Sequence, residues 1–208
     1  MAAKAERIKE RDPATAASVI TPAVAFGREV CGDLAAAEQR EWLVANGIGG
    51  FASATVAGSL TRRYHGLLIA ALAPPLGRTL LVSKLEETAA YEGRTYKLST
   101  NRWAGGAVDP QGYKLIERFQ LEGASPVWTY AFGDALLEKR IWMQHAANTT
   151  YVRYQLLRGS RPVELELRAL VNYRDYHSTT RAGDWRMSIE PQPHGLCVRA
   201  FDRATPFY

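Results

Sequence analysis

Short segments in which apolar and polar residues alternate follow one another along most of this chain, and they constrain its fold more than any other feature. Glycine (17 residues) and proline (10 residues) interrupt them often, and no long stretch keeps the 3.6-residue apolar period of an amphipathic helix. Strands at short intervals without intervening helices predict two antiparallel sheets packed face to face. The predicted strands cover residues 51–57, 66–72, 79–88, 95–99, 113–121, 127–132, 135–145, 151–157, 162–171, 185–190 and 195–201. We therefore expect an all-β fold, a large antiparallel two-sheet β-sandwich with little helix.

Helical composition appears at one place in the chain, residues 33–40. Asp33 stands at its start, where an aspartate side chain accepts a hydrogen bond from a free N–H of the first turn. Before it, the chain opens with charged and alanine-rich residues, and Pro13 and Pro22 prevent a long helix. We expect a partly flexible N-terminal arm over residues 1–28 and one large domain over residues 29–208, since sandwiches of about 200 residues are common.

Two alternating segments, residues 151–157 and 162–171, predict a β-hairpin because a short polar loop separates them. Direct pairing around that loop would place apolar side chains opposite each other on one face and opposite charges together on the other. The predicted pairs are Leu156 with Val163 and Arg153 with Glu166.

The charged residues do not form a nucleic-acid-binding pattern. Lysine and arginine (26) exceed the acidic residues (21) by a formal net charge of +5, but they are spread along the chain rather than clustered on one element. No apolar run approaches the roughly 18 residues that span a bilayer, and the charged N-terminus lacks the apolar stretch of a secretory signal. Cys31 and Cys197 are too few for a disulfide framework. We expect a cytoplasmic protein with two buried thiols and with neither nucleic acid nor membrane as a partner.

A glycine-rich segment, residues 47–52 (GIGGFA), satisfies the G-x-G-x-x-A pattern of dinucleotide-binding loops. That pattern requires a helix directly afterwards and an acidic residue about 20 positions further on, and neither is present. The glycines instead predict a tight loop with positive φ after Asn46. His145 and His194 lack partners at metal-ligand spacing, so we expect neither a cofactor nor a metal.

Residues 61–66 (TRRYHG) combine two arginines, an aromatic ring and an imidazole before a strongly apolar strand. One interpretation is a strand entrance with two solvated arginines and an edge histidine. The other is a functional surface, because burying an unpaired guanidinium is expensive and a core does not suit this segment. In a strand, Arg63 and His65 would share one face and Arg62 and Tyr64 the other. We expect at least one of the two arginines to be exposed or paired with an acid such as Asp175.

Seven blocks stand in order along the chain: residues 41–53 (EWLVANGIGGFAS), 61–68 (TRRYHGLL), 80–87 (LLVSKLEE), 101–103 (NRW), 126–130 (PVWTY), 148–150 (NTT) and 172–177 (NYRDYH). Together they resemble the bacterial and archaeal glycogen debranching enzyme family, over most of the chain. The resemblance implies an N-terminal, supersandwich-like β-sandwich that precedes a large helical α/α barrel. It also implies amylo-α-1,6-glucosidase activity, which removes branch-point glucose from glycogen or a related α-glucan.

Glycoside hydrolysis requires two carboxyl groups, about 5–5.5 Å apart for retention or about 6.5–9.5 Å for inversion. Glu86 and Glu87 are adjacent, and in a strand they point to opposite faces. The resemblance places the acid and the base on the C-terminal α/α barrel, which would follow Tyr208 and which we expect to be absent here. We therefore assign no catalytic residue and expect a chain that is inactive alone and positions substrate for that barrel, its partner. A free-standing glucan-binding or structural sandwich is the alternative, and a basic RNA-binding domain is the weakest interpretation.

Sugars are bound by aromatic faces against their C–H surfaces and by fork-like polar groups at their hydroxyls. The residues expected to contact the glucan or the barrel are Arg62, Arg63, Tyr64, His65, Trp103, Arg174, Asp175 and His177. For Arg174 and Asp175, a surface ion pair of little energetic value is an equal alternative. Trp103 is expected to be exposed, whereas Trp128 and Trp142, within apolar strands, are expected in the core.

Overall fold

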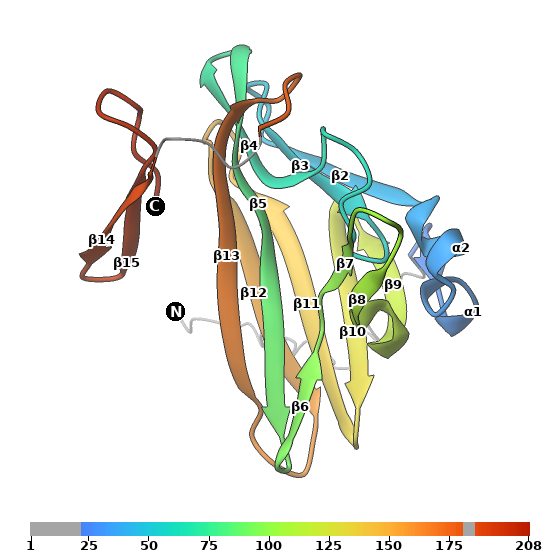
Figure 1. Ribbon diagram of the computed structural model, residues 1–208. Helices are drawn as coiled ribbons and strands as arrows, with labels where there is room; N and C mark the ends of the chain where they lie inside the picture. Colours follow the sequence, from blue (N-terminus) through green and yellow to red (C-terminus); the bar gives the residue numbers. More distant parts are fainter. Residues whose placement is uncertain (1–21, 181–185) are drawn as a thin grey trace, which may run out of the picture.

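The alternating segments form two antiparallel sheets that face each other (Figure 1). The structure, a computed structural model, describes residues 22–180 and 186–208. Sheet A has the order β1 (Ala25–Phe26), β9 (Ile116–Glu122), β10 (Ser125–Phe132), β11 (Ala135–Met143) and β12 (Thr150–Arg158). Sheet B has the order β13 (Glu164–Asp175), β5 (Leu76–Tyr91), β4 (Gly66–Ala73), β3 (Phe51–Thr55) and β2 (Glu41–Ala45), with β6 (Arg94–Lys97) beside β5. Two further pairs of strands belong to neither sheet: β7 (Thr100–Arg102) with β8 (Val108–Gln111), and β14 (Ser188–Gln192) with β15 (Gly195–Arg199). The predicted all-β fold is confirmed.

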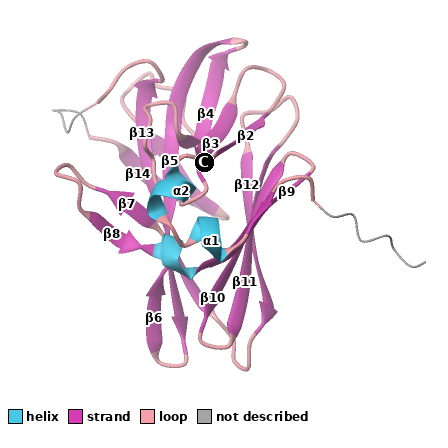
Figure 2. Cartoon of the chain, turned by 90° about the vertical axis from the view of Figure 1, so that its right-hand side faces the viewer, coloured by secondary structure: helices cyan, strands magenta, loops and turns pink. Residues whose placement is uncertain are grey.

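Short helices cover one side of the sandwich (Figure 2), namely α1 (Arg28–Cys31), α2 (Leu34–Glu38) and the 3-10 helix η1 (Gly112–Leu115). Asp33 caps α2 as predicted, since its carboxylate accepts a hydrogen bond of 2.8 Å from the Ala36 N–H. The strand predicted over residues 113–121 begins only at Ile116. The reason is a close contact, because the backbone of Gly112 and Tyr113 docks on Ser99 and Thr100. No helix in the described ranges is long and apolar enough to cross a membrane.

Aromatic side chains fill the space between the two sheets. The indole of Trp128 meets Trp42 edge to face at 5.4 Å between ring centroids, and it meets Phe119 at 5.1 Å. All three rings are buried, and the Trp128 N–H donates to the carbonyl oxygen of Val56 at 2.9 Å. The prediction that Trp128 lies in the core is confirmed. Burying side chains of this size stabilises the fold by roughly 1.5–3 kcal/mol each.

The predicted hairpin of residues 151–157 with residues 162–171 is wrong. β12 lies at the edge of sheet A, where Arg153 is opposite Arg140, and β13 lies at the edge of sheet B, where Glu166 is opposite Thr88. The connection between the two strands crosses from one sheet to the other at the lower end of Figure 1. Both strands turn an apolar face to the same core, so their alternation is the same as that of paired neighbours.

The two ends of the chain are described in part. Of the predicted N-terminal arm, residues 1–21 lie outside the described residues, while β1 pairs with β9 through Ala25 and Gln120. The strand predicted over residues 185–190 begins outside the described residues, and β14 forms from Ser188. Cys31 and Cys197 are buried free thiols, as predicted. Burial raises the pKa of the Cys31 thiol to about 11, which makes it a poor nucleophile.

Candidate functional site

The loop between β3 and β4 holds four of the candidate residues, and it is a turn rather than a strand. The His65 N–H donates to the carbonyl oxygen of Arg62 at 3.1 Å, which closes the turn. Side chains in a turn do not alternate between two faces. The predicted grouping of Arg63 with His65 and of Arg62 with Tyr64 is therefore wrong.

Arg62 and His65 instead approach one carboxylate, that of Glu41 at the start of β2. Arg62 Nε lies 2.7 Å from Glu41 Oε1, and His65 Nε2 lies 3.3 Å from the same oxygen without hydrogen-bond geometry. His65 Nδ1 accepts a hydrogen bond from the Thr61 N–H at 3.1 Å. Burial lowers the pKa of His65, although the Glu41 charge opposes the shift. His65 is therefore a neutral, buried ring that shapes the loop. Arg62 is an exposed guanidinium paired with an acid, as predicted, although the acid is Glu41 and not Asp175.

Arg63 and Tyr64 contact the turn that follows β13. Arg63 Nη1 donates to the carbonyl oxygen of His177 at 2.7 Å, and the Tyr64 hydroxyl lies 3.2 Å from His177 Nδ1. The Tyr64 ring meets the His177 ring edge to face at 5.7 Å and lies 5.5 Å from the Tyr176 ring. Tyr64 is 40% exposed and His177 is exposed as well. The fold thus brings three predicted residues, Arg63, Tyr64 and His177, together on the surface, although His177 is distant from the other two in sequence.

Arg174 holds this arrangement in place through backbone carbonyl groups. Its Nη2 donates to the carbonyl oxygen of Arg63 at 2.5 Å, and its Nη1 donates to that of Ser178 at 2.8 Å and of Tyr176 at 3.3 Å. Burial and the neighbouring Arg63 charge lower the pKa of Arg174. Asp175 forms no ion pair with it in the described structure and instead accepts from the His177 N–H at 2.8 Å. Arg174 is therefore a positioning residue, and the predicted alternative of a surface ion pair with Asp175 is not observed.

Two further residues complete the arrangement, Arg78 and Tyr176. The Arg78 guanidinium lies 5.4 Å from the centroid of the Tyr176 ring, and its Nη1 donates to the Tyr176 hydroxyl at 3.2 Å. Arg78 Nε donates to the carbonyl oxygen of Gly49 at 2.7 Å. A single arginine near the start of a strand gives no sequence signal, and sequence reasoning missed it. We call the set Arg63, Tyr64, Arg78, Arg174, Tyr176 and His177 the Tyr176 cluster.

The glycine-rich loop beside this cluster is built around Asn46. Its side-chain oxygen accepts from the N–H groups of Ile48 and Gly50 at 3.0 and 2.9 Å. Its amide donates to Ala147 and Asn148, both at 3.0 Å, so the loop is joined to the turn between β11 and β12. Gly47 and Gly49 have φ of +81° and +101°, as predicted, and a strand rather than a helix follows. The loop therefore lacks the helix N-terminus of a dinucleotide site.

Trp103 lies apart from the other candidate residues. It is 57% exposed, as predicted, on the β7–β8 ribbon, where its indole N–H donates to the carbonyl oxygen of Asp109 at 2.7 Å. The described structure shows no hydrogen bond, ion pair or ring contact between Trp103 and the Tyr176 cluster. The eight candidate residues therefore do not form a single site.

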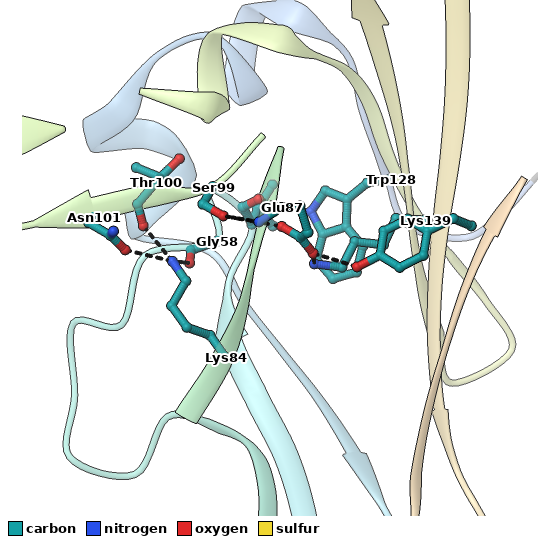
Figure 3. Close-up of polar contacts among 10 residues, drawn as sticks. Gly58, Lys84, Glu87, Ser99, Thr100, Asn101, Trp128 and Lys139 are labelled. Carbon is teal, nitrogen blue, oxygen red and sulfur yellow. Dashed lines mark hydrogen bonds and ion pairs between the residues drawn. The ribbon is translucent and has the colours of Figure 1, made fainter. Parts of the chain in front are cut away.

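A second concentration of polar groups lies between the sheets, around Glu87 (Figure 3). The Glu87 carboxylate accepts hydrogen bonds from the ammonium of Lys139 and, at 2.7 Å, from the Tyr154 hydroxyl. Ser99 Oγ accepts from the Glu87 N–H at 2.9 Å. Burial, followed by the Glu87 charge, raises the pKa of Tyr154. The carboxylate, on sheet B, is thus satisfied by two groups from sheet A, and pairing of this kind is the condition for a stable buried charge.

Lys84 lies on the other side of β5 in the same view. Its ammonium donates to the carbonyl oxygen of Thr100 at 2.9 Å, to Asn101 Oδ1 at 2.8 Å and to the carbonyl oxygen of Gly58 at 3.3 Å. Burial lowers the pKa of Lys84 to about 8. Each of the three N–H donors of Lys84 thus meets an acceptor. Lys84 therefore connects neighbouring segments to β5 and is not a free amine.

The two adjacent carboxylates of β5 are each bound by another side chain. Glu86 and Glu87 diverge as predicted, since Glu86 accepts from Asn101 Nδ2 at 2.7 Å while Glu87 binds Lys139. One cavity beside Glu87, between the sheets, measures about 40 Å³, which is room for water but too little for a sugar. A second hollow of about 210 Å³ is lined by Glu86, Glu87 and Glu166. Within residues 22–180 and 186–208, no three histidine, cysteine or acidic side chains are placed to hold a metal ion.

Comparison with known families gives one clear finding. Residues 40–208 match the family model described as "Glycogen debranching enzyme N terminal". No curated protein and no solved structure gives a significant match to the chain.

Proposed function

Because this chain belongs to the glycogen debranching enzyme N-terminal family, we propose that it positions an α-glucan branch for a linked α/α-barrel domain that hydrolyses α-1,6-glucosidic bonds. The surface that contacts the glucan or the barrel is the Tyr176 cluster together with Arg62. Glycosidic bond cleavage needs a pair of carboxyl groups at a defined separation, and in this proposal the barrel supplies that pair.

The observation that carries the proposal is that three residues of the Tyr176 cluster, Arg63, Tyr64 and His177, are exposed and yet held in place by hydrogen bonds. Arg174 joins its two loops through backbone carbonyl groups, and Arg78 fixes the Tyr176 ring from a third element. A merely solvated surface gains little from ordering long side chains, because each loses up to about 2 kcal/mol of rotamer entropy. A binding surface gains, since groups that are already in place lose less entropy when the ligand arrives.

The chemistry of the cluster suits a neutral polyhydroxylated ligand. Arg63 presents a planar fork of N–H donors, and the Tyr64 hydroxyl and the His177 ring both donate and accept. The ring of Tyr64 offers an apolar face for the C–H surface of a sugar. Arg62, paired with Glu41, adds a second exposed guanidinium beside them.

The test uses a debranching enzyme that carries this domain together with its barrel. Arg63→Ala should raise KM for a branched limit dextrin several-fold while the melting temperature changes little, because Arg63 lies at the surface. Arg63→Lys should recover part of the loss, since an ammonium replaces the charge but not the planar fork. Arg118→Ala is the matched control, because Arg118 is exposed on sheet A. Equal KM for all three variants, or a loss of activity that follows only the loss of stability, refutes the proposal.

A further inference from the structure

Trp142 and Tyr151 lie opposite each other on the outer face of sheet A. Their neighbours Ile141 and Val152 point into the core between the sheets, and successive side chains of a strand point to opposite faces. Trp142 is therefore on the solvent side of β11, and the prediction that it lies in the core is wrong. The apolar residues around it belong to the other face of the same strand.

The two rings form an ordered, partly exposed aromatic surface. Their centroids are 5.3 Å apart and their planes differ by 16°, and Tyr151 is 42% exposed. The Tyr151 hydroxyl donates to Gln144 Oε1 at 2.8 Å, which fixes the orientation of the phenol ring. Cross-strand stacking stabilises the sheet, but it leaves an apolar face of the pair toward solvent.

The residues next to the pair are charged in equal numbers. Glu138 binds both Arg153, at 2.8 Å, and Arg140, at 3.5 Å, and Arg140 also pairs with Glu122. Two guanidinium groups thus meet two carboxylates, so the charges within this ion-paired group balance. Such a strip lacks the excess of positive charge that binds phosphates, and it retains planar donors and acceptors for hydroxyl groups.

The aromatic pair is continuous with the glycine-rich loop and, through it, with the Tyr176 cluster. His145 follows Gln144 in the chain and lies against Gly47, where an added Cβ would come within 2.7 Å of its ring. The Ala146 N–H donates to the carbonyl oxygen of Asn46 at 2.7 Å. Since Arg78 binds Gly49 on the other side of the same loop and also the Tyr176 hydroxyl, a series of contacts runs from Tyr151 to Tyr176.

We infer that the Trp142–Tyr151 pair is a second glucan subsite, which binds the linear α-1,4-linked part of the substrate while the Tyr176 cluster faces the branch. The glucan class rests on the proposed function, whereas the location rests on the ring geometry and the neutral polar strip. A pyranose ring stacks on the exposed aromatic face, and Arg153, 49% exposed at its side chain, donates to the hydroxyls.

The experiment measures maltoheptaose binding to the full chain by titration calorimetry. Tyr151→Ala should weaken binding about tenfold, a loss of about 1.4 kcal/mol, because the exposed ring is removed. Tyr151→Phe keeps the ring and should bind within about twofold of the unmodified chain, since one solvent-exposed hydrogen bond is lost. Tyr208→Ala removes an exposed tyrosine outside the candidate residues and should not change the affinity.

Arg153→Ala provides a second variant that removes only an exposed side chain and should also weaken binding. Unchanged affinity in both Tyr151→Ala and Arg153→Ala, or no binding by the unmodified chain, overturns the subsite. The proposed function is judged separately, by KM of the Arg63 variants in the enzyme with its barrel. The experiments can therefore refute the Trp142–Tyr151 subsite and still support the proposed function, or the reverse.

Discussion

Arg174 and Arg63 are joined by a 2.5 Å hydrogen bond from a guanidinium nitrogen to a backbone carbonyl oxygen, across 111 residues of sequence. The contact links the end of β13 to the loop before β4. It determines where Arg63 and Tyr64 stand relative to His177. The geometry of the exposed cluster therefore depends on a residue that need not touch a ligand.

Arg174→Ala should lower the free energy of unfolding by about 1–3 kcal/mol, because the backbone carbonyl groups of two loops lose a charged donor. Amide hydrogen exchange in residues 61–65 and 175–178 should accelerate more than elsewhere. Arg174→Lys should restore little, since an ammonium does not reproduce the flat guanidinium that serves several carbonyl groups. Wild-type exchange rates in the alanine variant would show that the loops are held by other contacts.

His65 should make the fold less stable as pH falls from about 6.5 toward 5. Burial lowers its pKa in the folded state, so the unfolded chain binds a proton at a higher pH than the folded chain does. The free energy of unfolding therefore decreases as pH falls through that window and is fully recovered above it. Urea denaturation at pH 5 and pH 7 measures the effect.

His65→Asn keeps an acceptor near the Thr61 N–H and should flatten this pH dependence. His194→Asn, which changes an exposed histidine, is the control and should retain it. The groups that face His65, the Glu41 carboxylate and the Arg62 guanidinium, are left unchanged in both variants. An unaltered slope in His65→Asn contradicts the assignment.

Glu87→Gln should destabilise the fold by about 3–5 kcal/mol, because it leaves the Lys139 ammonium charged and without its partner between the sheets. The double variant Glu87→Gln with Lys139→Met should recover part of the loss, since no uncompensated charge remains. Glu86→Gln changes the adjacent residue on the other face and should cost less than about 1 kcal/mol. Denaturant midpoints rank the three variants, and equal effects of the two single glutamine variants count against a buried ion pair.

The chain by itself should release no glucose from a glycogen limit dextrin. Glu86 and Glu87 diverge, and each is bound by another side chain, Glu86 by Asn101 and Glu87 by Lys139. The measurement is glucose release against a buffer blank. Release above the blank that disappears when one carboxylate is substituted would place catalysis in this chain and refute the expectation.

Most strand positions and the two-sheet architecture were predictable, because alternation reports which face of a strand meets the core, whereas β2, β7 and β8 were not predicted. The partner of each strand was not. Arg153 and Glu166 have the spacing of a cross-strand pair, yet they lie in different sheets that share one core. The alternation of a strand is the same whether its sequence neighbour lies beside it or across the core from it.

The site was predictable only in part for a related reason. The segment around Arg63 and Tyr64 was identified by its composition, but a turn orients its side chains differently from a strand. The burial of His65 and the role of Glu41 depend on contacts between distant elements. Arg78 carries no local signal at all, because only the fold brings it over Tyr176.

The placement of β13 at the edge of sheet B has a consequence for the order in which the molecule assembles. In sheet A, β9, β10, β11 and β12 are neighbours in both sequence and space, so they can form as each strand leaves the ribosome. The second edge of β5, in contrast, stays unpaired until the distant strand β13 has been made, since Ala90 is opposite Glu164 and Thr79 is opposite Asp175. Pairing over such separations is slow because a long loop closes first. We expect β13 docking to limit the folding rate, and the nascent chain to expose the edge of β5 until it occurs.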